Sequence, residues 1–451
     1  MNVLPIALLA LVSSAAPLSA PRRVTLEDAL AYAREHQPSL LAARARLAAI
    51  QADARVPRAL YLPRLAATAQ AFEGTANNST AAYLGAPGVD LPRIGGTRAG
   101  TDSWSPYPST VAALGLRQEV FDFGRIAALE AVTDSAVLVE RSLSEAARLD
   151  VDFAVEDAFF AVQAARGVLD AAASAWQRSR LNRDTAAAGV KAGLRSPIEL
   201  TRAEAELSRF EIARVRAEAG LSIAQGVLAA VVGAPELRLD AAGGPPVMAP
   251  APSLDEVVRA ALENEPALRA RRASAEQQRA VTRAIGAELR PDLQLTASVS
   301  GRAGDAPPTS GAQPSGAGWI PNVPNWDGGL VLSWPLFDGA VRARASASRA
   351  REAARDAEIQ ELQASVTAAS QQAWLDLDAA QQALPSLEKS LEAGRANYAQ
   401  AQARFKAGLG SSVELADAQE LLAEAEVELA VGRYRLARAR VHLGRVMAQP
   451  R

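Results

Sequence analysis

The feature that most constrains this fold is an internal duplication. The segment 25–68 recurs as 253–296 at a constant offset of 228 residues. Further on, the tetrapeptide Lys-Ala-Gly-Leu at 191–194 recurs at 406–409, now at an offset of 215. A unit of more than about 200 residues is too long for a solenoid repeat, so the duplication predicts two equivalent halves within one architecture.

The two halves divide into matching segments. We expect a signal peptide over about 1–20, repeat 1 over 21–232, an equatorial linker over 233–252 and repeat 2 over 253–451. For repeat 1 the expected elements are helices at about 25–60, strands at about 61–73 and 110–121, a long helix at about 125–191 and a helix at about 197–232. For repeat 2 they are helices at about 253–288, strands at about 289–300 and 328–337, a long helix at about 341–406 and a helix at about 412–447.

Apolar residues spaced three and four apart predict the helices. The spacing runs from Ile359 to Phe405 with one irregular step, and repeat 1 keeps the same register 215 residues earlier. Alanine dominates these seams, so neighbouring backbones can approach closely. At ~1.5 Å per residue the long helices would each extend roughly 100 Å, which no globular core needs. The pattern therefore predicts extended helical hairpins, with a generic periplasmic coiled coil as the alternative.

Alternation of apolar and polar residues predicts the strands. Leu293, Leu295, Ala297 and Val299 interleave with polar residues, for example. Each strand has about the 9–11 residues that a tilted outer-membrane strand needs. Long loops rich in Gly, Pro, Ser and Asn join the strands of each repeat. Aromatic residues lie in or beside these loops, where an interfacial girdle would sit: Trp104, Tyr107, Trp319 and Trp326.

Four strands are too few for a barrel with a water-filled lumen, and unpaired edges are not tolerated in lipid. We therefore expect other copies of the chain to complete the sheet, and three copies would supply twelve strands. Soluble β-hairpins on a helical protein are the alternative interpretation.

Composition excludes several classes of function. The formal net charge of −2 leaves no basic footprint, so we expect no nucleic-acid partner. Cysteine is absent from the sequence, and the two histidines, His36 and His442, lie in different repeats, so we expect no metal ion and no cofactor. The sequence contains no phosphate loop, metal-ligand spacing or nucleophile elbow, and we expect no enzymatic activity.

The N-terminus and the apolar runs bear on localisation. An apolar segment followed by small residues within 1–20 predicts a secretory signal peptide. Beyond it, no uncharged apolar run reaches the ~20 residues that a membrane-spanning helix needs. We therefore expect export, and a membrane segment made of strands rather than helices.

These features together make the chain resemble the TolC-type outer-membrane efflux family over essentially its whole mature length. The resemblance lies in the segments that begin the two repeats, 25–30 and 253–258, and in the prolines Pro38, Pro63, Pro266 and Pro291. It lies also in the strand-to-helix junctions at 120–125 and 336–339 and in the helical tips at 192–200 and 407–415. It implies a mixed, mainly α fold: a homotrimer with a twelve-stranded barrel in the outer-membrane lipid of a Gram-negative bacterium, continued by a twelve-helix periplasmic α-barrel. It also implies a periplasmic adaptor protein and an inner-membrane pump as partners, with the trimer as their passive exit duct.

The resemblance also assigns residues to a gate at the helical tips. Glu414 and Asp417 match the acidic constriction rings, Phe405 matches an aromatic gate position, and Glu199 matches an acidic partner on the neighbouring tip. The arginine of the family that ties the closed gate aligns with Gly410, so Arg195 on the other tip becomes the candidate substitute. The turns with Gly193 and Leu194, and with Gly408 and Leu409, match the adaptor-docking surface. Capping of a helix N-terminus is the alternative role for Glu199, Glu414 and Asp417.

One competing function shares the long helical hairpins. A periplasmic adaptor or structural coiled-coil protein would have them, but it would not carry two amphipathic strand pairs with long polar loops in symmetric positions. A passive duct serves whatever its pump selects, so drugs, metal ions, solvents and secreted polypeptides are all compatible cargoes.

Overall fold

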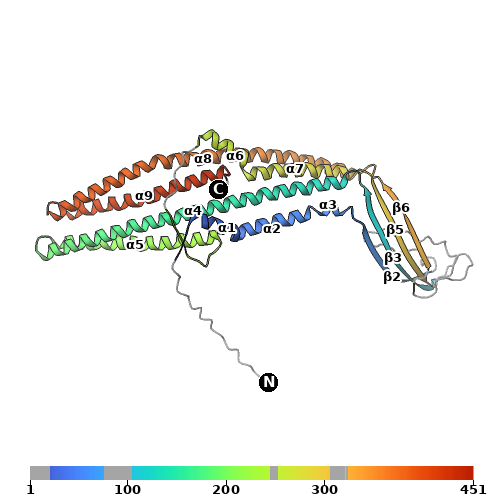
Figure 1. The fold of residues 1–451 in the computed structure, drawn as a ribbon, viewed down its shortest axis with the longest axis horizontal. Coiled ribbons are helices and arrows are strands. Elements are labelled where there is room, and N and C mark those ends of the chain that lie inside the picture. Colours follow the sequence, from blue (N-terminus) through green and yellow to red (C-terminus); the bar gives the residue numbers. More distant parts are fainter. Residues whose placement is uncertain (1–20, 76–103, 244–251, 305–319, 321–322, 450–451) are drawn as a thin grey trace, which may run out of the picture. The chain divides into compact units, whose positions relative to one another are not determined.

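The computed structural model describes residues 21–75, 104–243, 252–304, 320 and 323–449 (Figure 1). The expected signal peptide and Trp319 lie outside these residues. The chain forms two compact units. One comprises Met1–Arg46, Arg141–Arg269 and Gln360–Arg451, called here the helical unit, and the other comprises Leu47–Glu140 and Ala270–Ile359, called here the sheet unit.

Apart from the short helix α3, which the described part of repeat 2 lacks, the order of the helices and long strands is the same in both repeats. Repeat 1 contains β1 (Arg22–Val24), α1 (Leu26–His36), α2 (Pro38–Asp53), α3 (Val56–Ala59), β2 (Arg64–Thr75), β3 (Pro106–Phe121), α4 (Arg125–Lys191) and α5 (Pro197–Val232). After β4 (Leu239–Ala241), repeat 2 contains α6 (Leu254–Asn264), α7 (Pro266–Ala287), β5 (Asp292–Gly304), β6 (Val323–Ser333), α8 (Gly339–Lys406) and α9 (Ser412–Val446). The mixed, mainly helical fold with four long strands is the one that the sequence predicts.

Local signals explain where the short helices begin and end. The side chains of Thr25 and Ser253 accept hydrogen bonds from backbone N–H groups in the first turns of α1 and α6, and Ser253 forms a full capping box with Glu256. Pro38 and Pro266 then start α2 and α7. Proline is tolerated in a first helical turn but disfavours a helical conformation in the residue before it. Each expected stretch of short helices is therefore divided at its proline.

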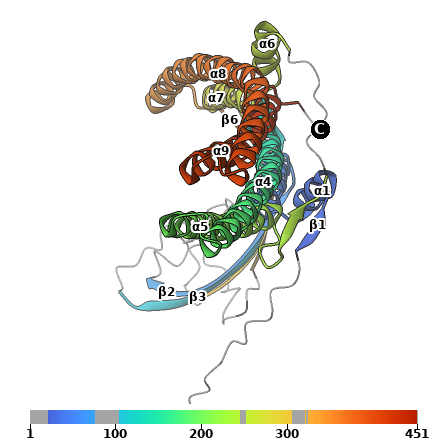
Figure 2. The same ribbon diagram turned by 90° about the vertical axis from the view of Figure 1, so that its left-hand side faces the viewer.

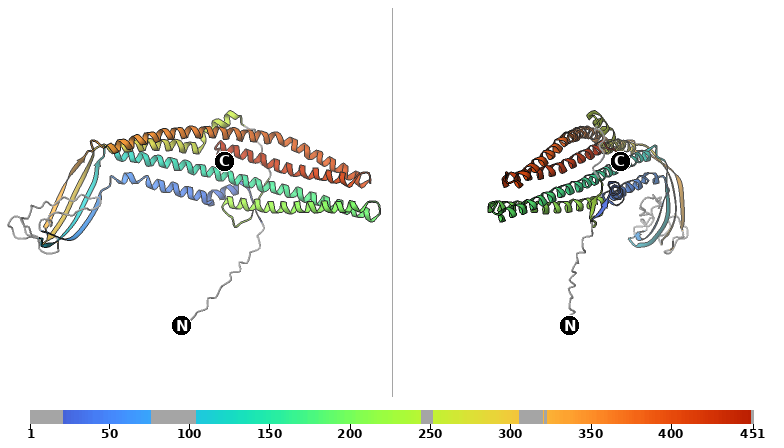
Figure 3. Two further views of the ribbon diagram at one scale, coloured as in Figure 1. Left: turned by 180° about the vertical axis from the view of Figure 1, so that it is seen from behind. Right: turned by 60° about the vertical axis from the view of Figure 1, so that its left-hand side comes forward.

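The four long strands form one antiparallel sheet in the sheet unit, in the order β2-β3-β5-β6 (Figure 3). In its central register Leu114 pairs with Val299, and Val299 with Trp326. The strand bounds differ from expectation most in β6, which spans Val323–Ser333 rather than about 328–337. Pro335 has no backbone N–H to donate to a neighbouring strand, which accounts for the early end.

The sheet has one apolar and one polar face, and the apolar face is the exposed one. Leu114, Val299 and Trp326 are all more than half exposed, and register places them on the same face. On the other face Ser298 and Ser300 are buried, and the Ser298 hydroxyl donates to Asp327. A sheet of a water-soluble protein normally buries its apolar face, so this surface is built for an apolar surrounding.

An aspartate at each strand-to-helix junction holds the first turn of the long helix that follows. The Asp122 carboxylate accepts hydrogen bonds from the N–H groups of Ile126 and Gly124 and from the Tyr61 hydroxyl. Burial alone would raise the pKa of Asp122, but these donors outweigh burial and lower it. Asp338 accepts from the first N–H groups of α8 in the same way. The shared Phe-Asp motif is thus a helix cap in both repeats.

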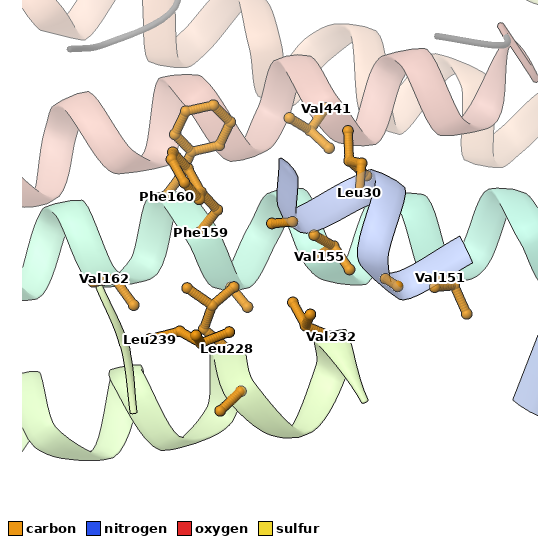
Figure 4. Packing of buried hydrophobic residues seen from close by; sticks show 14 of the residues in the cluster. Leu30, Val151, Val155, Phe159, Phe160, Val162, Leu228, Val232, Leu239 and Val441 are labelled. Carbon is orange, nitrogen blue, oxygen red and sulfur yellow. The ribbon is translucent and has the colours of Figure 1, made fainter. Parts of the chain in front are cut away.

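In the helical unit, four helical segments lie side by side in the order α8, α9, α4 and α5 (Figures 1 and 2). The core where α1 meets α4, α5 and α9 contains Val155, Phe159, Leu228 and Val441 (Figure 4). By length and composition α5 could cross a membrane. This is weak evidence for a membrane-spanning helix, because the core helix of a soluble protein passes the same test.

The expected linker contains an element that periodicity did not reveal. Strand β4 pairs in parallel with β1, and each has only three residues, too few to show alternation. Asp240 of β4 is buried, and Arg166 of α4 donates to both of its carboxylate oxygens at 2.6 Å. Paired and hydrogen-bonded charges are the form in which a buried aspartate is tolerated. The linker is therefore anchored to α4 and to the start of repeat 1.

Candidate functional site at the helical tips

The two helical tips have the same backbone turn. Gly193 and Gly408 both have a φ of +72°, a left-handed conformation that glycine adopts without strain. The N–H of Leu194 donates to the carbonyl of Gly189, and the N–H of Leu409 donates to that of Arg404, both at 2.9 Å. These bonds satisfy carbonyl groups that the end of a long helix would otherwise leave unpaired. The leucines themselves are about four-fifths exposed, with 83% for Leu194 and 75% for Leu409.

The return helices begin differently at the two tips. Ser411 is the N-cap of α9, and its hydroxyl accepts from the N–H of Glu414 at 3.2 Å. Ser196 holds the equivalent position before α5, but its side chain makes no capping hydrogen bond. The next serine, Ser412, is the first residue of α9 and not its N-cap. The expected acidic site residue Glu414 is thus held at an N-terminus, where a negative charge is stabilised by the helix dipole.

Arg195 links the first tip to the end of α8. Its guanidinium donates to Glu199 at 2.7 Å and to the backbone carbonyl of Phe405, and lies 3.6 Å from the centroid of the Phe405 ring. The side chain is only 13% exposed. Gly189 makes room for it, because a Cβ atom there would lie 2.7 Å from Cδ of Arg195. This is a cation–π contact reinforced by two charge-assisted hydrogen bonds.

The second tip has the arginine and the glycine in exchanged positions. Arg404 occupies the position equivalent to Gly189, and Gly410 occupies the position equivalent to Arg195, both at the offset of 215. A Cβ atom at Gly410 would lie 3.1 Å from Cβ of Arg404, so the two positions face each other in this tip as well. Arg404 pairs with Glu414 at 3.0 Å, but it is 49% exposed and stays within its own hairpin.

The structure brings some of the expected gate residues together and separates others. Phe405 is buried among α8 and α9 side chains such as Leu415, beneath Arg195, rather than presented to solvent. Asp417 is exposed and shares a hollow of about 280 Å³ with Glu199 and Phe405. Glu414 lies outside this hollow and pairs with Arg404. Arg195, Glu199 and Phe405 therefore form one cluster, which Asp417 borders.

Sequence reasoning missed a set of polar contacts between the two hairpins, further along the helices from the tips. Arg178 of α4 forms two hydrogen bonds with Glu426 of α9, at 2.8 and 3.2 Å. Asn182 donates to Gln419 at 2.7 Å, and Gln419, which is buried, donates to a backbone carbonyl of α4. Burial raises the pKa of the neighbouring Tyr398 hydroxyl and keeps it protonated. The sequence signal that could have indicated these contacts is a polar residue beside an Ala/Leu seam, such as Gln419.

Comparisons with known proteins agree on one family. The family model described as "Outer membrane efflux protein" matches residues 29–234 and 257–449, which are the two repeats. The chain is 27% identical over 338 residues to the fusaric acid resistance protein FusA of Burkholderia cepacia, covering 72% of this chain and 58% of that protein. It is 28% identical over 416 residues to protein CyaE of Bordetella pertussis, covering 88% and 78%. The chain thus spans less than two thirds of the length of FusA.

Solved structures show the same fold at lower identity. The outer-membrane channel OprN superposes with a TM-score of 0.75 at 22% identity, covering 94% of this chain and 90% of that one. The outer membrane protein VceC of Vibrio cholerae gives 0.73 at 18%, covering 94% and 96%. The CmeC outer membrane channel of Campylobacter jejuni gives 0.75 at 14%, covering 94% and 85%.

Proposed function

Because this chain belongs to the outer membrane efflux protein family, whose members lie in the outer membrane of Gram-negative bacteria, we propose that it forms a passive exit duct. Three copies assemble into the duct, which conducts cargo from an inner-membrane pump and a periplasmic adaptor to the exterior. The duct belongs to a tripartite efflux or type I secretion system and has no enzymatic activity of its own.

The apolar outer face of the sheet is the observation that carries this proposal. A row of exposed side chains that includes Leu114, Val299 and Trp326 would face lipid, and the buried polar face around Ser298 would line the passage. Strands β2 and β6 lie at the ends of the sheet order and offer unpaired edges within the described part of the chain. Pairing these edges with further copies satisfies their backbone groups, as lipid requires.

The helical hairpins α4–α5 and α8–α9 would then continue the passage through the periplasm and end in a gate. Arg195, held between Glu199 and Phe405, ties the two hairpins of one chain, a contact that would hold the gate closed. Glu414 and Asp417, repeated three times around the axis, would form acidic rings that favour cations. The exposed Leu194 and Leu409, presented by the turns at Gly193 and Gly408, form the surface on which an adaptor docks.

The cargo of the system is best supported as a small molecule. The relative FusA is named for resistance to fusaric acid, and this chain is similar to it over 72% of its own length. This likeness supports a duct that serves a drug-type pump. Restored resistance on co-expression with candidate adaptor–pump pairs would identify the system.

Fractionation and conductance test the duct directly. We expect the full-length protein in the outer-membrane fraction as a trimer, and small cation-selective conductance steps after reconstitution in a planar lipid bilayer. The double variant E414Q/D417N should lower the preference for potassium over chloride. E424Q, which alters an exposed carboxylate further along α9, is the matched control and should leave it unchanged. A protein that remains soluble in the periplasm after gentle lysis would instead support an adaptor or structural coiled coil.

Docking is tested in cells. Once a partner pair restores resistance, we expect L194S and L409S to abolish it while the protein still reaches the outer membrane. L421S, at an exposed leucine on the side of α9, is the matched control. If all three variants behave alike, the tips are not the docking surface.

A further inference from the structure

A hollow of about 670 Å³ lies between α8 and α9 in the helical unit, far along the chain from the tip residues. Small and apolar side chains that line it, including Ala383, Leu387 and Phe153, are called here its floor. The exposed Arg435 and Arg438 also line it and are called here its rim. This volume lies within the range of pockets that hold small organic ligands, about 300–1,000 Å³. The hollow therefore combines an apolar surface with two cations.

The hollow lies on the face of α8 opposite to the one that α6 covers. Trp374 donates to the carbonyl of Pro252 at the start of α6. At about 100° per residue, Ala383 lies about 180° around α8 from Trp374, and Ala379 about 140°. In Figure 2, α1 and α6 lie on the outer side of the arc formed by α8, α9, α4 and α5. In the duct proposed above, the hollow would thus open into the passage.

The two arginines on the rim differ in what surrounds them. Arg438 pairs with Asp157 of α4 at 3.0 Å. Arg435 is exposed, and among the described residues no carboxylate lies within ion-pair distance of it. The guanidinium of Arg435 therefore keeps all its donors available, in the planar arrangement that suits a carboxylate.

The other charged groups stand at the far end of the hollow. His442 lies seven positions after Arg435, a distance of about 10 Å along α9. Burial is the main cause that lowers the pKa of His442; Asp376 opposes this and Arg438 adds to it, so the imidazole is neutral at neutral pH. Asp376 lies at this end beside His442 and does not neutralise Arg435.

Repeat 1 has no such site at the equivalent positions. With the offset of 215, Arg435 corresponds to Gly220, Arg438 to Ile223, and His442 to Val227. Ile223 and Val227 are exposed at 67% and 49%, so this surface is apolar and accessible. Three chains around one axis would therefore alternate three basic hollows with three apolar surfaces.

From this alternation we infer that the passage carries a binding site for organic anions with an apolar body. The guanidinium of Arg435 binds the anionic group, and the positive charge of Arg438 attracts it as well. The apolar body of the ligand packs on the alanine side chains and against Phe153. The inference rests on the proposed duct, and it names a class of ligand for the wall of the passage: amphipathic anions such as aromatic carboxylates.

Equilibrium dialysis of the detergent-purified full-length trimer tests the site, with 1-naphthoate as the probe and 1-naphthylmethylammonium as the cation of matched shape. We expect saturable naphthoate binding, weakened about tenfold or more in R435Q/R438Q, since charge-assisted hydrogen bonds are lost. D376N should not weaken it. R433Q is the matched control, because Arg433 is an exposed arginine on the other side of α9.

Conductance in potassium chloride, measured on the same variants, separates this inference from the proposed function. Normal conductance with naphthoate binding that is unsaturable, equal to that of the ammonium probe, or unchanged in R435Q/R438Q overturns the anion site and leaves the duct intact. Absence of conductance in the wild type overturns the duct itself. Normal conductance in R435Q/R438Q also shows that the variant folds and assembles, so weakened binding there is due to the lost charges.

Discussion

The tips of the two repeats share one backbone turn, and in each an arginine pairs with the equivalent glutamate, yet only one of the two arginines also reaches the other hairpin. In repeat 1, Arg195 extends from the loop across to Phe405 of the other hairpin. In repeat 2, Arg404 sits on the helix and pairs with Glu414 of its own hairpin. In each tip the position facing the arginine is glycine, because only one of the two positions can carry a large side chain. The two arginine positions are six residues apart, and only the arginine in the loop adds a link between hairpins to its local ion pair.

Removal of the link should have the largest effect. We expect R195A to favour the open tip by about 2 kcal/mol per chain, because it removes a partly buried cation–π contact and two charge-assisted hydrogen bonds. Planar-bilayer recordings should then show a conductance several-fold above wild type. Unchanged conductance with an intact trimer would mean that the link does not hold the gate.

A methyl group at position 189 tests the same link without touching the arginine. The added Cβ would lie 2.7 Å from Cδ of Arg195, so G189A should displace the guanidinium and cost about 1–2 kcal/mol of the closed state. Conductance should rise less than in R195A. In the R195A background the substitution should add nothing further, and an additive effect would show that Gly189 acts independently of Arg195.

The two serines before the return helices distinguish the tips by capping. S411A removes the acceptor for the N–H of Glu414 and should destabilise the first turn of α9 by about 1 kcal/mol. S196A should lower the stability of the first turn of α5 by only about a few tenths of a kcal/mol, because Ser196 makes no capping hydrogen bond. Hydrogen exchange of these backbone amides measures both, and equal loss of protection would contradict the difference.

The smallest effect is expected from the second arginine. Arg404 and Glu414 are both nearly half exposed, and exposed ion pairs contribute only about 0–1 kcal/mol because water and salt screen them. R404A should therefore leave conductance within about twofold of wild type. A gain as large as that of R195A would remove the proposed distinction between the tips.

Much of the fold could be predicted because its signals are local. The duplication, the 3-4 spacing of the long helices and the alternation at Leu293–Val299 each lie within a short window of sequence. The division of the short helices at Pro38 and Pro266, and the end of β6 before Pro335, follow from the backbone chemistry of proline. Strands β1 and β4 were not predicted, because a strand of three residues is too short to show alternation.

The candidate site could be predicted only in part. Resemblance indicated Arg195, Glu199 and Phe405 as separate gate candidates, and the structure joins them in one cluster. Their joint role in a gate stays a prediction, as do the acidic rings at Glu414 and Asp417. The polar contact between Asn182 and Gln419 was not foreseen, because it joins residues of different repeats that share no sequence neighbourhood.

The sequence by itself determined the two-fold repeat, the helical and strand segments and the identity of the family, since periodicity, caps and proline positions act within a few residues. Only the tertiary structure decided which arginine crosses between hairpins, which face of the sheet is left exposed, and where Arg435 and Arg438 lie beside small alanine side chains. Such contacts join residues far apart in the sequence, and their energies depend on burial and distance, which no local pattern encodes.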